Sequence, residues 1–163
     1  TMEIVLFAGI IVHIVQAYII AVQNKNARPV HYAVNKSGAN SKWYSRSMTL
    51  LGTLILLFLI IHIKHFWWVS RITGLEKTAS GEGNLFAEMQ SVFAEGWVVI
   101  IYLLGVISLC WHLIHGFKSA FQTLGITHRK YSTFISNLGV AYSLIISFLF
   151  AMMPVAIFFG WIQ

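Results

Sequence analysis

The chain has 163 residues, of which 58% are hydrophobic and 10% are charged, and it carries five acidic side chains, all glutamate. Soluble domains carry about 25% charged residues, so this composition excludes a soluble or an intrinsically disordered protein. The net charge of +6 lies between long apolar runs, which is typical of a membrane protein and not of a nucleic-acid-binding module. Cys110 is the single cysteine, which excludes a disulfide within the chain, a C-x-x-C-H motif and a thiolate iron–sulfur cluster. Any metal centre here therefore needs histidine ligands.

Four apolar segments follow one another, and each is long enough to cross a bilayer, which takes about 20 residues. The first, residues 4–22, lacks the basic region and the small-residue cleavage site of a signal peptide. The second and third, residues 48–69 and 97–124, carry most of the histidines, and the fourth, residues 134–162, carries none. We therefore predict an all-α fold, a polytopic transmembrane helical bundle that forms a single domain over residues 1–163.

The connections between these segments differ in charge, and this difference predicts the orientation. The first connection has five basic residues and no acid: Lys25, Arg28, Lys36, Lys42 and Arg46. The last connection contains Arg129 and Lys130, whereas residues 70–96 hold four of the five glutamates. Because short cytoplasmic loops are rich in Lys and Arg, we expect the first and last connections in the cytoplasm and residues 70–96 outside.

Five histidines lie inside or at the ends of the apolar segments: His13, His62, His65, His112 and His115. Ionisable groups at membrane depth are costly, and they mark functional sites by default. One such histidine is equally well explained by a hydrogen bond between helices. Several of them on three segments, with few acids nearby, favour axial ligation of haem b by pairs of imidazoles from facing helices.

Two ligands of one haem must lie at similar depth, which a rise of 1.5 Å per residue lets us estimate. His13 lies about 16 Å from Asn24, and His115 lies about 15 Å from Gly125. These two depths match and predict a pair. His62 lies about 24 Å from Arg46, and His112 is intermediate at about 20 Å.

Two further histidines keep alternative interpretations. His112 is a candidate ligand of a second haem, a hydrogen-bond partner of a haem propionate, or a packed polar residue. His65 stands beside Lys64, Trp67 and Trp68, which favours an interfacial anchor over a quinone site. His31 and His128 lie in the cytoplasmic connections, where we expect them to face solvent or a partner.

Three motifs in the chain resemble a known family. The stretch W-H-L-I-H-G-F-K-S-A-F-Q-T-L-G, Trp111 to Gly125, resembles the fourth helix of succinate dehydrogenase cytochrome b subunits of the single-anchor, two-haem type. The likeness is greatest to the bacteroidetes-like branch. The segments V-H-I-V-Q-A-Y-I-I-A-V-Q-N and L-I-I-H-I-K-H-F-W resemble the second and third helices of that family. The resemblance covers almost the whole chain.

The resemblance implies a set of haem ligands. Members of that family have five membrane helices and two b haems, with one axial histidine on each of the first four helices. Carried over by motif, His13 and His115 ligate the proximal haem near the cytoplasm, and His62 ligates the distal haem. The partner of His62 lies on the family's first helix, which has no counterpart in this chain. The resemblance thus implies that the chain has four of the five helices and would fully ligate one of two expected haems, the distal haem being absent, ligated differently or completed by a segment outside this sequence.

The resemblance also implies a function in the bacterial inner (cytoplasmic) membrane. The chain would be the non-catalytic, electron-transferring anchor subunit of a succinate:quinone oxidoreductase or fumarate reductase. Its partners would be an FAD-containing flavoprotein, an iron–sulfur subunit, membrane lipids and menaquinone, with no nucleic acid. On the cytoplasmic side, four residues would bind haem propionates or menaquinone, or act as the positive-inside signal and contact anionic lipid: Lys42, Tyr44, Arg46 and Ser47.

Two other functions compete with this interpretation. One is a cytochrome b subunit of a hydrogenase or formate dehydrogenase, which the partner proteins would reveal. The other is a cofactor-free polytopic transporter in which the histidines relay protons or pack, and which would be colourless.

Some related fumarate reductases carry a glutamate two residues before the fourth-helix histidine, where this chain has Leu113.

Overall fold

A computed structural model describes residues 2–27, 39, 41–78, 81–126, 128 and 130–162. Within these ranges the chain forms helices and an isolated antiparallel bridge between Lys77 and Gly83. The helices, in chain order, are α1 (Met2–Asn26), α3 (Trp43–Arg46), α4 (Met48–His62), the π-helix η1 (Ile63–Thr73), α5 (Leu85–Phe93), α6 (Gly96–Thr123) and α7 (Ser132–Phe158).

Four helical segments are long and apolar enough to cross a membrane: Met2–Asn26, Met48–Thr73, Gly96–Thr123 and Ser132–Phe158. This confirms the predicted all-α fold with four spans. All four begin within two residues of their predicted positions. The second span extends beyond residue 69 because η1 continues the helix, and the fourth ends at Phe158 instead of residue 162.

Glycines end the two longest helices of the second half of the chain. Gly125 and Gly160 have φ values of 72° and 67°, a conformation that glycine adopts without steric cost. The next residue in each case donates its N–H to a carbonyl five residues back, Ile126 to Phe121 and Trp161 to Ala156. These bonds form Schellman motifs that satisfy the last carbonyls of α6 and α7.

The described chain divides into two compact units, residues 1–49 and residues 50–163. The first unit holds α1, α3 and the first residues of α4, and no residue of α1 is buried. The second unit holds the rest of the chain and its core. Phe93, Val98, Val99, Tyr102 and Ile157 form that core, near the end of the unit where α5 lies.

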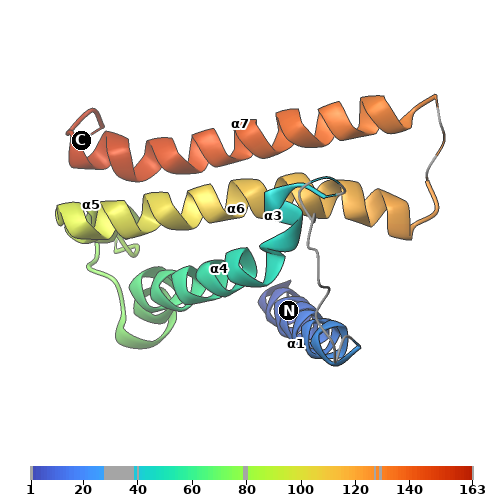
Figure 1. Cartoon of the computed structure of the whole chain (residues 1–163). Helices are drawn as coiled ribbons and strands as arrows, with labels where there is room; N and C mark the ends of the chain where they lie inside the picture. The colour runs from blue at the N-terminus through green and yellow to red at the C-terminus, as the bar shows by residue number, and fades with distance from the viewer. Residues whose placement is uncertain are drawn as a thin grey trace. The chain divides into compact units, whose positions relative to one another are not determined.

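Helices α6 and α7 run antiparallel, side by side (Figure 1). On α7, Gly139, Ser143 and Ser147 recur every fourth residue and are all buried. Small residues at this spacing let two membrane helices approach closely. The side chain of Phe117 on α6 fills the space above Gly139, where a Cβ atom would lie 2.5 Å from Phe117 Cδ1.

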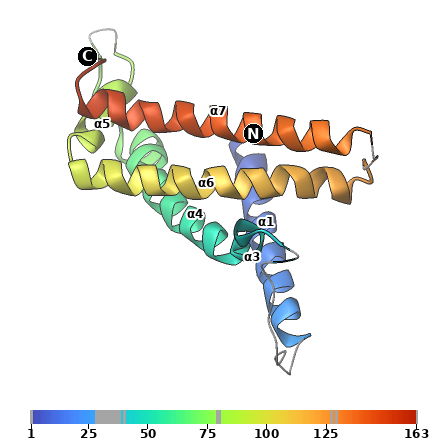
Figure 2. The same cartoon turned by 45° about the horizontal axis from the view of Figure 1, so that its top comes forward.

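Helix α4 meets α6 through side chains and crosses it obliquely (Figure 2). The Phe58 ring occupies the surface of Gly105, where a Cβ atom would lie 2.6 Å from Phe58 Cγ. Nearer the other end, His112 Cε1 lies 3.7 Å from the position of a Cβ atom on Gly52. Two glycines, one on each helix, thus receive a ring from the opposite helix.

The close approach at Gly105 has a measurable consequence. We expect Gly105→Ala to lower the stability of the second unit by about 1–3 kcal/mol, because its methyl group would overlap the base of the Phe58 ring. Gly52→Ala, at the same pair of helices, is the matched control, since its methyl group would meet His112 at 3.7 Å, an ordinary contact. Unfolding in detergent, followed by circular dichroism, measures both. Equal stability of the two variants would contradict the packing at Gly105.

The second connection contains a helix, α5, that the sequence interpretation did not predict. Asn84 Oδ1 accepts a hydrogen bond from Ala87 N at 3.0 Å and caps the first turn. Phe93 at the end of α5 is 2% exposed and anchors the helix in the core. The signal was present in the sequence, since Asn is a favoured N-cap and apolar residues follow it at helical spacing.

Candidate functional site

The best-defined group of chemically active side chains surrounds Tyr102 on α6. We call it the Tyr102 cluster: Tyr102, Phe58, His62, His65, Phe66 and Phe93. The centroid of the Tyr102 ring lies 5.1 Å from that of Phe58, 4.9 Å from Phe93 and 6.3 Å from Phe66, in edge-to-face arrangements. Both imidazole centroids lie 6.0 Å from the Tyr102 centroid. Tyr102 is thus the centre on which α4, η1, α5 and α6 converge.

A hydrogen bond ties the cluster together. His65 Nδ1 and the Tyr102 hydroxyl oxygen lie 3.1 Å apart, and the two rings are nearly parallel at 4°. Tyr102 itself is 4% exposed, so its hydroxyl depends on this partner. The sequence interpretation favoured His65 as an interfacial anchor; the structure shows that its imidazole also holds a buried phenol.

The π-helix η1 brings His65 and Phe66 to Tyr102. Its last turn shows the wider hydrogen-bond pattern, in which Gly74 N donates to the Val69 carbonyl, five residues back, at 2.8 Å. Segments of π-helix are rare and occur frequently at functional sites. Sequence reasoning missed this element, because its aromatic and apolar residues are equally compatible with a continued α-helix.

His62 stands at the junction of α4 and η1, with an aromatic ring one turn to either side. Its centroid lies 5.6 Å from that of Phe58 and 5.2 Å from that of Phe66. The His62 side chain is exposed. An accessible imidazole between two aromatic rings is suited to bind the iron of a planar cofactor.

The second histidine level lies farther along α6. His112 packs against α4 at Gly52, as described above, and His115 follows it by three residues. His115 is half-buried, and a Cβ atom on the adjacent Gly116 would meet nothing within 4 Å. The side of α6 next to His115 therefore has room for a flat group, whereas His112 is engaged within the second unit.

These contacts correct the depth estimates made from the sequence. His62 is level with Tyr102, which lies ten residues before His112 and thirteen before His115 on α6. The His62 level is therefore about 15 Å from the His112 level and about 20 Å from the His115 level, instead of about 4 Å and 9 Å. The error arose because depths were counted from Arg46 and Gly125 as if these residues were level, whereas α6 extends well past the beginning of α4.

His13 lies on α1, in the first unit, and its side chain is exposed. Gly9, one turn earlier, has nothing within 4 Å of the position of a Cβ atom. Counted from the observed helix ends, Asn26 and Thr123, His13 lies about 20 Å and His115 about 12 Å inside its helix. If His13 and His115 lie at the same level, the C-terminal end of α1 must extend about 8 Å farther beyond that level than the C-terminal end of α6. The pairing of the two histidines stays a prediction.

The four residues predicted for the cytoplasmic side gather on and beside the short helix α3. Lys42 Nζ lies 5.8 Å from the centroid of the Tyr44 ring, in a cation–π contact. Arg46 Nη1 donates to the carbonyl and, at 3.2 Å, to the hydroxyl oxygen of Ser41. Ser47 ends α3 and donates its N–H to the Trp43 carbonyl at 3.0 Å. The two cations are thus brought within one helical turn, directly before the first turn of α4.

The remaining two histidines, His31 and His128, belong to the connections between the spans. His31 lies outside the described residues. His128 is exposed, and its Nδ1 accepts the N–H of Lys130 at 3.2 Å. This contact is local to the loop and agrees with the expected solvent-facing position.

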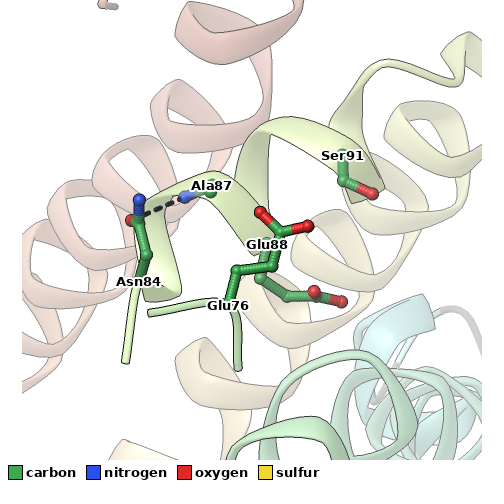
Figure 3. A pocket seen from close by; sticks show the side chains of 5 residues that line it. All are labelled: Glu76, Asn84, Ala87, Glu88 and Ser91. Atoms are coloured by element: carbon green, nitrogen blue, oxygen red, sulfur yellow. Dashed lines mark hydrogen bonds between the residues drawn. The ribbon is translucent and has the colours of Figure 1, made fainter. Parts of the chain in front are cut away.

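A shallow hollow lies beside the cluster, at the beginning of α5. Figure 3 shows the side chains that line it: Glu76, Asn84, Ala87, Glu88 and Ser91. Glu88 is near enough to His65 to interact with it electrostatically. The hollow therefore puts the Glu88 carboxylate near His65, at the polar edge of the Tyr102 cluster.

No group of three or more His, Cys, Asp or Glu side chains is placed to hold a metal ion among the residues that the structure describes. Bis-imidazole ligation of haem iron needs only two histidines in apolar surroundings, which is a different requirement. Comparison with protein-family models, curated proteins and solved structures finds no match to this chain. Function is therefore inferred from the side chains, the spans that carry them and the resemblance of the three motifs.

Proposed function

We propose that this chain is the haem b-binding membrane-anchor subunit of a bacterial succinate:quinone oxidoreductase or fumarate reductase. It would carry electrons between an iron–sulfur subunit and menaquinone, while dicarboxylate chemistry takes place on a flavoprotein partner. The observation that carries the proposal is the presence of a candidate imidazole ligand on each of three apolar spans: His13, His62 and His115.

The surroundings of these imidazoles fit an apolar, planar ligand. Gly9 precedes His13 by one turn and Gly116 follows His115, and both leave open space where a side chain would otherwise stand. Phe58 and Phe66 flank His62. Bound haem would supply reversible one-electron chemistry at its iron, and the chain's residues would hold it, bury it and exclude water.

The spacing along α6 supports two separate haem positions. His62 and His115 are about 20 Å apart in level, so they cannot be the two ligands of one iron. His115 would pair with His13 at the cytoplasmic level, and His62 would serve the outer level. A second ligand for the outer position is not assigned within this chain.

The cytoplasmic partner would meet the chain near α3. Lys42 and Arg46 place two positive charges directly before the first turn of α4. Cations there suit haem propionates, the headgroup of menaquinone or an acidic surface of the iron–sulfur subunit. The same charges would contribute to the positive-inside signal, which favours a position of this connection on the cytoplasmic side of the bacterial inner membrane.

The optical spectrum of the native membrane complex tests the proposal. We expect a reduced b-type spectrum, together with a co-purifying flavoprotein and iron–sulfur subunit and succinate:menaquinone activity. Two haems per complex would mean that another segment supplies the ligand opposite His62, and one would mean that the His13–His115 pair stands alone. A nickel or molybdenum subunit would favour the hydrogenase or formate dehydrogenase alternative, and a colourless protein would reject the haem proposal.

A further inference from the structure

We propose that Tyr102 and His65 are positioning residues that fix the plane of the His62 imidazole. The inference deepens the proposed function and depends on it, since it takes His62 as an axial ligand. It assigns a role to His65 and to the buried Tyr102, which the proposed haem ligands leave unexplained.

The geometry restricts the His62 ring on three sides. Phe58 and Phe66 stand one turn before and one turn after it, and the Tyr102 ring faces it from α6 at a centroid distance of 6.0 Å. Phe58 in turn packs directly on the backbone of Gly105, so its ring has little room to shift toward α6. These three rings therefore limit the orientations that the imidazole can adopt.

The hydrogen bond between His65 and Tyr102 fastens the turn that follows His62 to α6. His65 lies three residues after His62, on the next turn of the same helical segment, so the bond ties the outer end of that segment to α6. Tyr102 has little freedom of its own, because its ring packs edge-to-face against Phe93, which is 2% exposed. Removal of the Tyr102 hydroxyl would leave the Tyr102 ring packed against Phe93 but would release His65 and the turn that follows His62.

Partners of this kind orient a ligand and tune its metal. The plane of an axial imidazole affects the ligand field of the iron, and therefore both its electron paramagnetic resonance signal and its reduction potential. A residue that only stabilised the fold would alter the unfolding temperature without changing these two quantities.

The test uses the intact complex with Tyr102→Phe, which keeps the ring and removes the hydroxyl. The haem at the His62 level is first identified as the signal lost in His62→Leu. We expect Tyr102→Phe to retain both haems, to change the low-spin ferric signal of that haem, and to alter its reduction equilibrium about tenfold, which is about 59 mV for a one-electron couple. The signal of the other haem should not change.

His65→Leu provides a second variant that removes the same bond from the other side. If the bond is the cause, the double variant should show the same change as either single variant, because coupled residues are not additive. Tyr142→Phe on α7 is the matched control, since its ring packs on Phe117 at 5.8 Å, outside the cluster. We expect it to leave both signals unaltered.

Three results would overturn the inference. Both single variants could leave the signal and potential of the His62-level haem unchanged. The two substitutions could add in the double variant. His62→Leu could retain every haem while His65→Leu abolished one, which would make His65 the ligand. Absence of haem in the wild-type complex would instead reject the proposed function, so the two failures are distinguishable.

Discussion

Replacement of His115 by leucine is expected to remove one b haem from the membrane complex, while His112→Leu should retain it. The two histidines are three residues apart on α6 and share roughly one face of the helix, so sequence spacing alone does not separate them. The structure does. His112 is packed against α4 at Gly52, whereas His115 stands beside the open space at Gly116.

Haem per complex, measured from the reduced spectrum of the purified protein, decides between the two. His13→Leu should lose the same haem as His115→Leu, and the double variant should lose no more. His128→Leu is the control, because that exposed side chain is bonded within its own loop. Loss of haem in His112→Leu with full retention in His115→Leu would contradict the assignment.

The fold could be predicted from the sequence because its dominant signal is simple. Continuous apolar stretches of the length of a bilayer leave the backbone little choice except a helix, since a helix satisfies all its hydrogen bonds internally. The ends of the helices were harder to predict from the sequence. The fourth span ends earlier than hydropathy suggested, because Gly160 turns the backbone and Trp161 closes a Schellman motif while the sequence is still apolar.

The candidate site could be predicted in part. The three histidines were found from their position in apolar spans, which is a local property of the sequence. Their relative levels were not, because these depend on how far α6 passes α4, and this is decided by contacts between distant residues such as Phe58 with Gly105 and His112 with Gly52.

Tyr102 was missed for the same reason. A tyrosine within an apolar helix gives no sign of its partner, and His65 reaches it by way of a π-helix that no sequence pattern indicated. The hydrophobic periodicity along a helix identifies which residues are buried but does not identify which polar groups meet across helices.

The strongest functional effect should come from His62→Leu. We expect succinate-dependent reduction of menaquinone to fall by at least about 100-fold, because loss of a ligand should cost no less than loss of an outer-shell partner, for which about 100-fold is the upper end of the range. Succinate oxidation by a soluble dye, which accepts electrons before the membrane subunit, should stay near the wild-type rate. This split follows from the separation of about 20 Å between the His62 and His115 levels, since loss of the outer position leaves the cytoplasmic one intact.

A matched variant distinguishes ligation from packing at this site. Phe66→Leu removes one aromatic wall of His62 but no donor atom, so it should lower stability and retain the haem. Both activities and the haem content are measured on the same preparations. If quinone reduction persisted in His62→Leu, or if dye reduction were lost with it, the outer position would not lie on the path of electrons through this chain. The Phe66→Leu result would then show whether the cluster around Tyr102 serves only to pack η1 against α6.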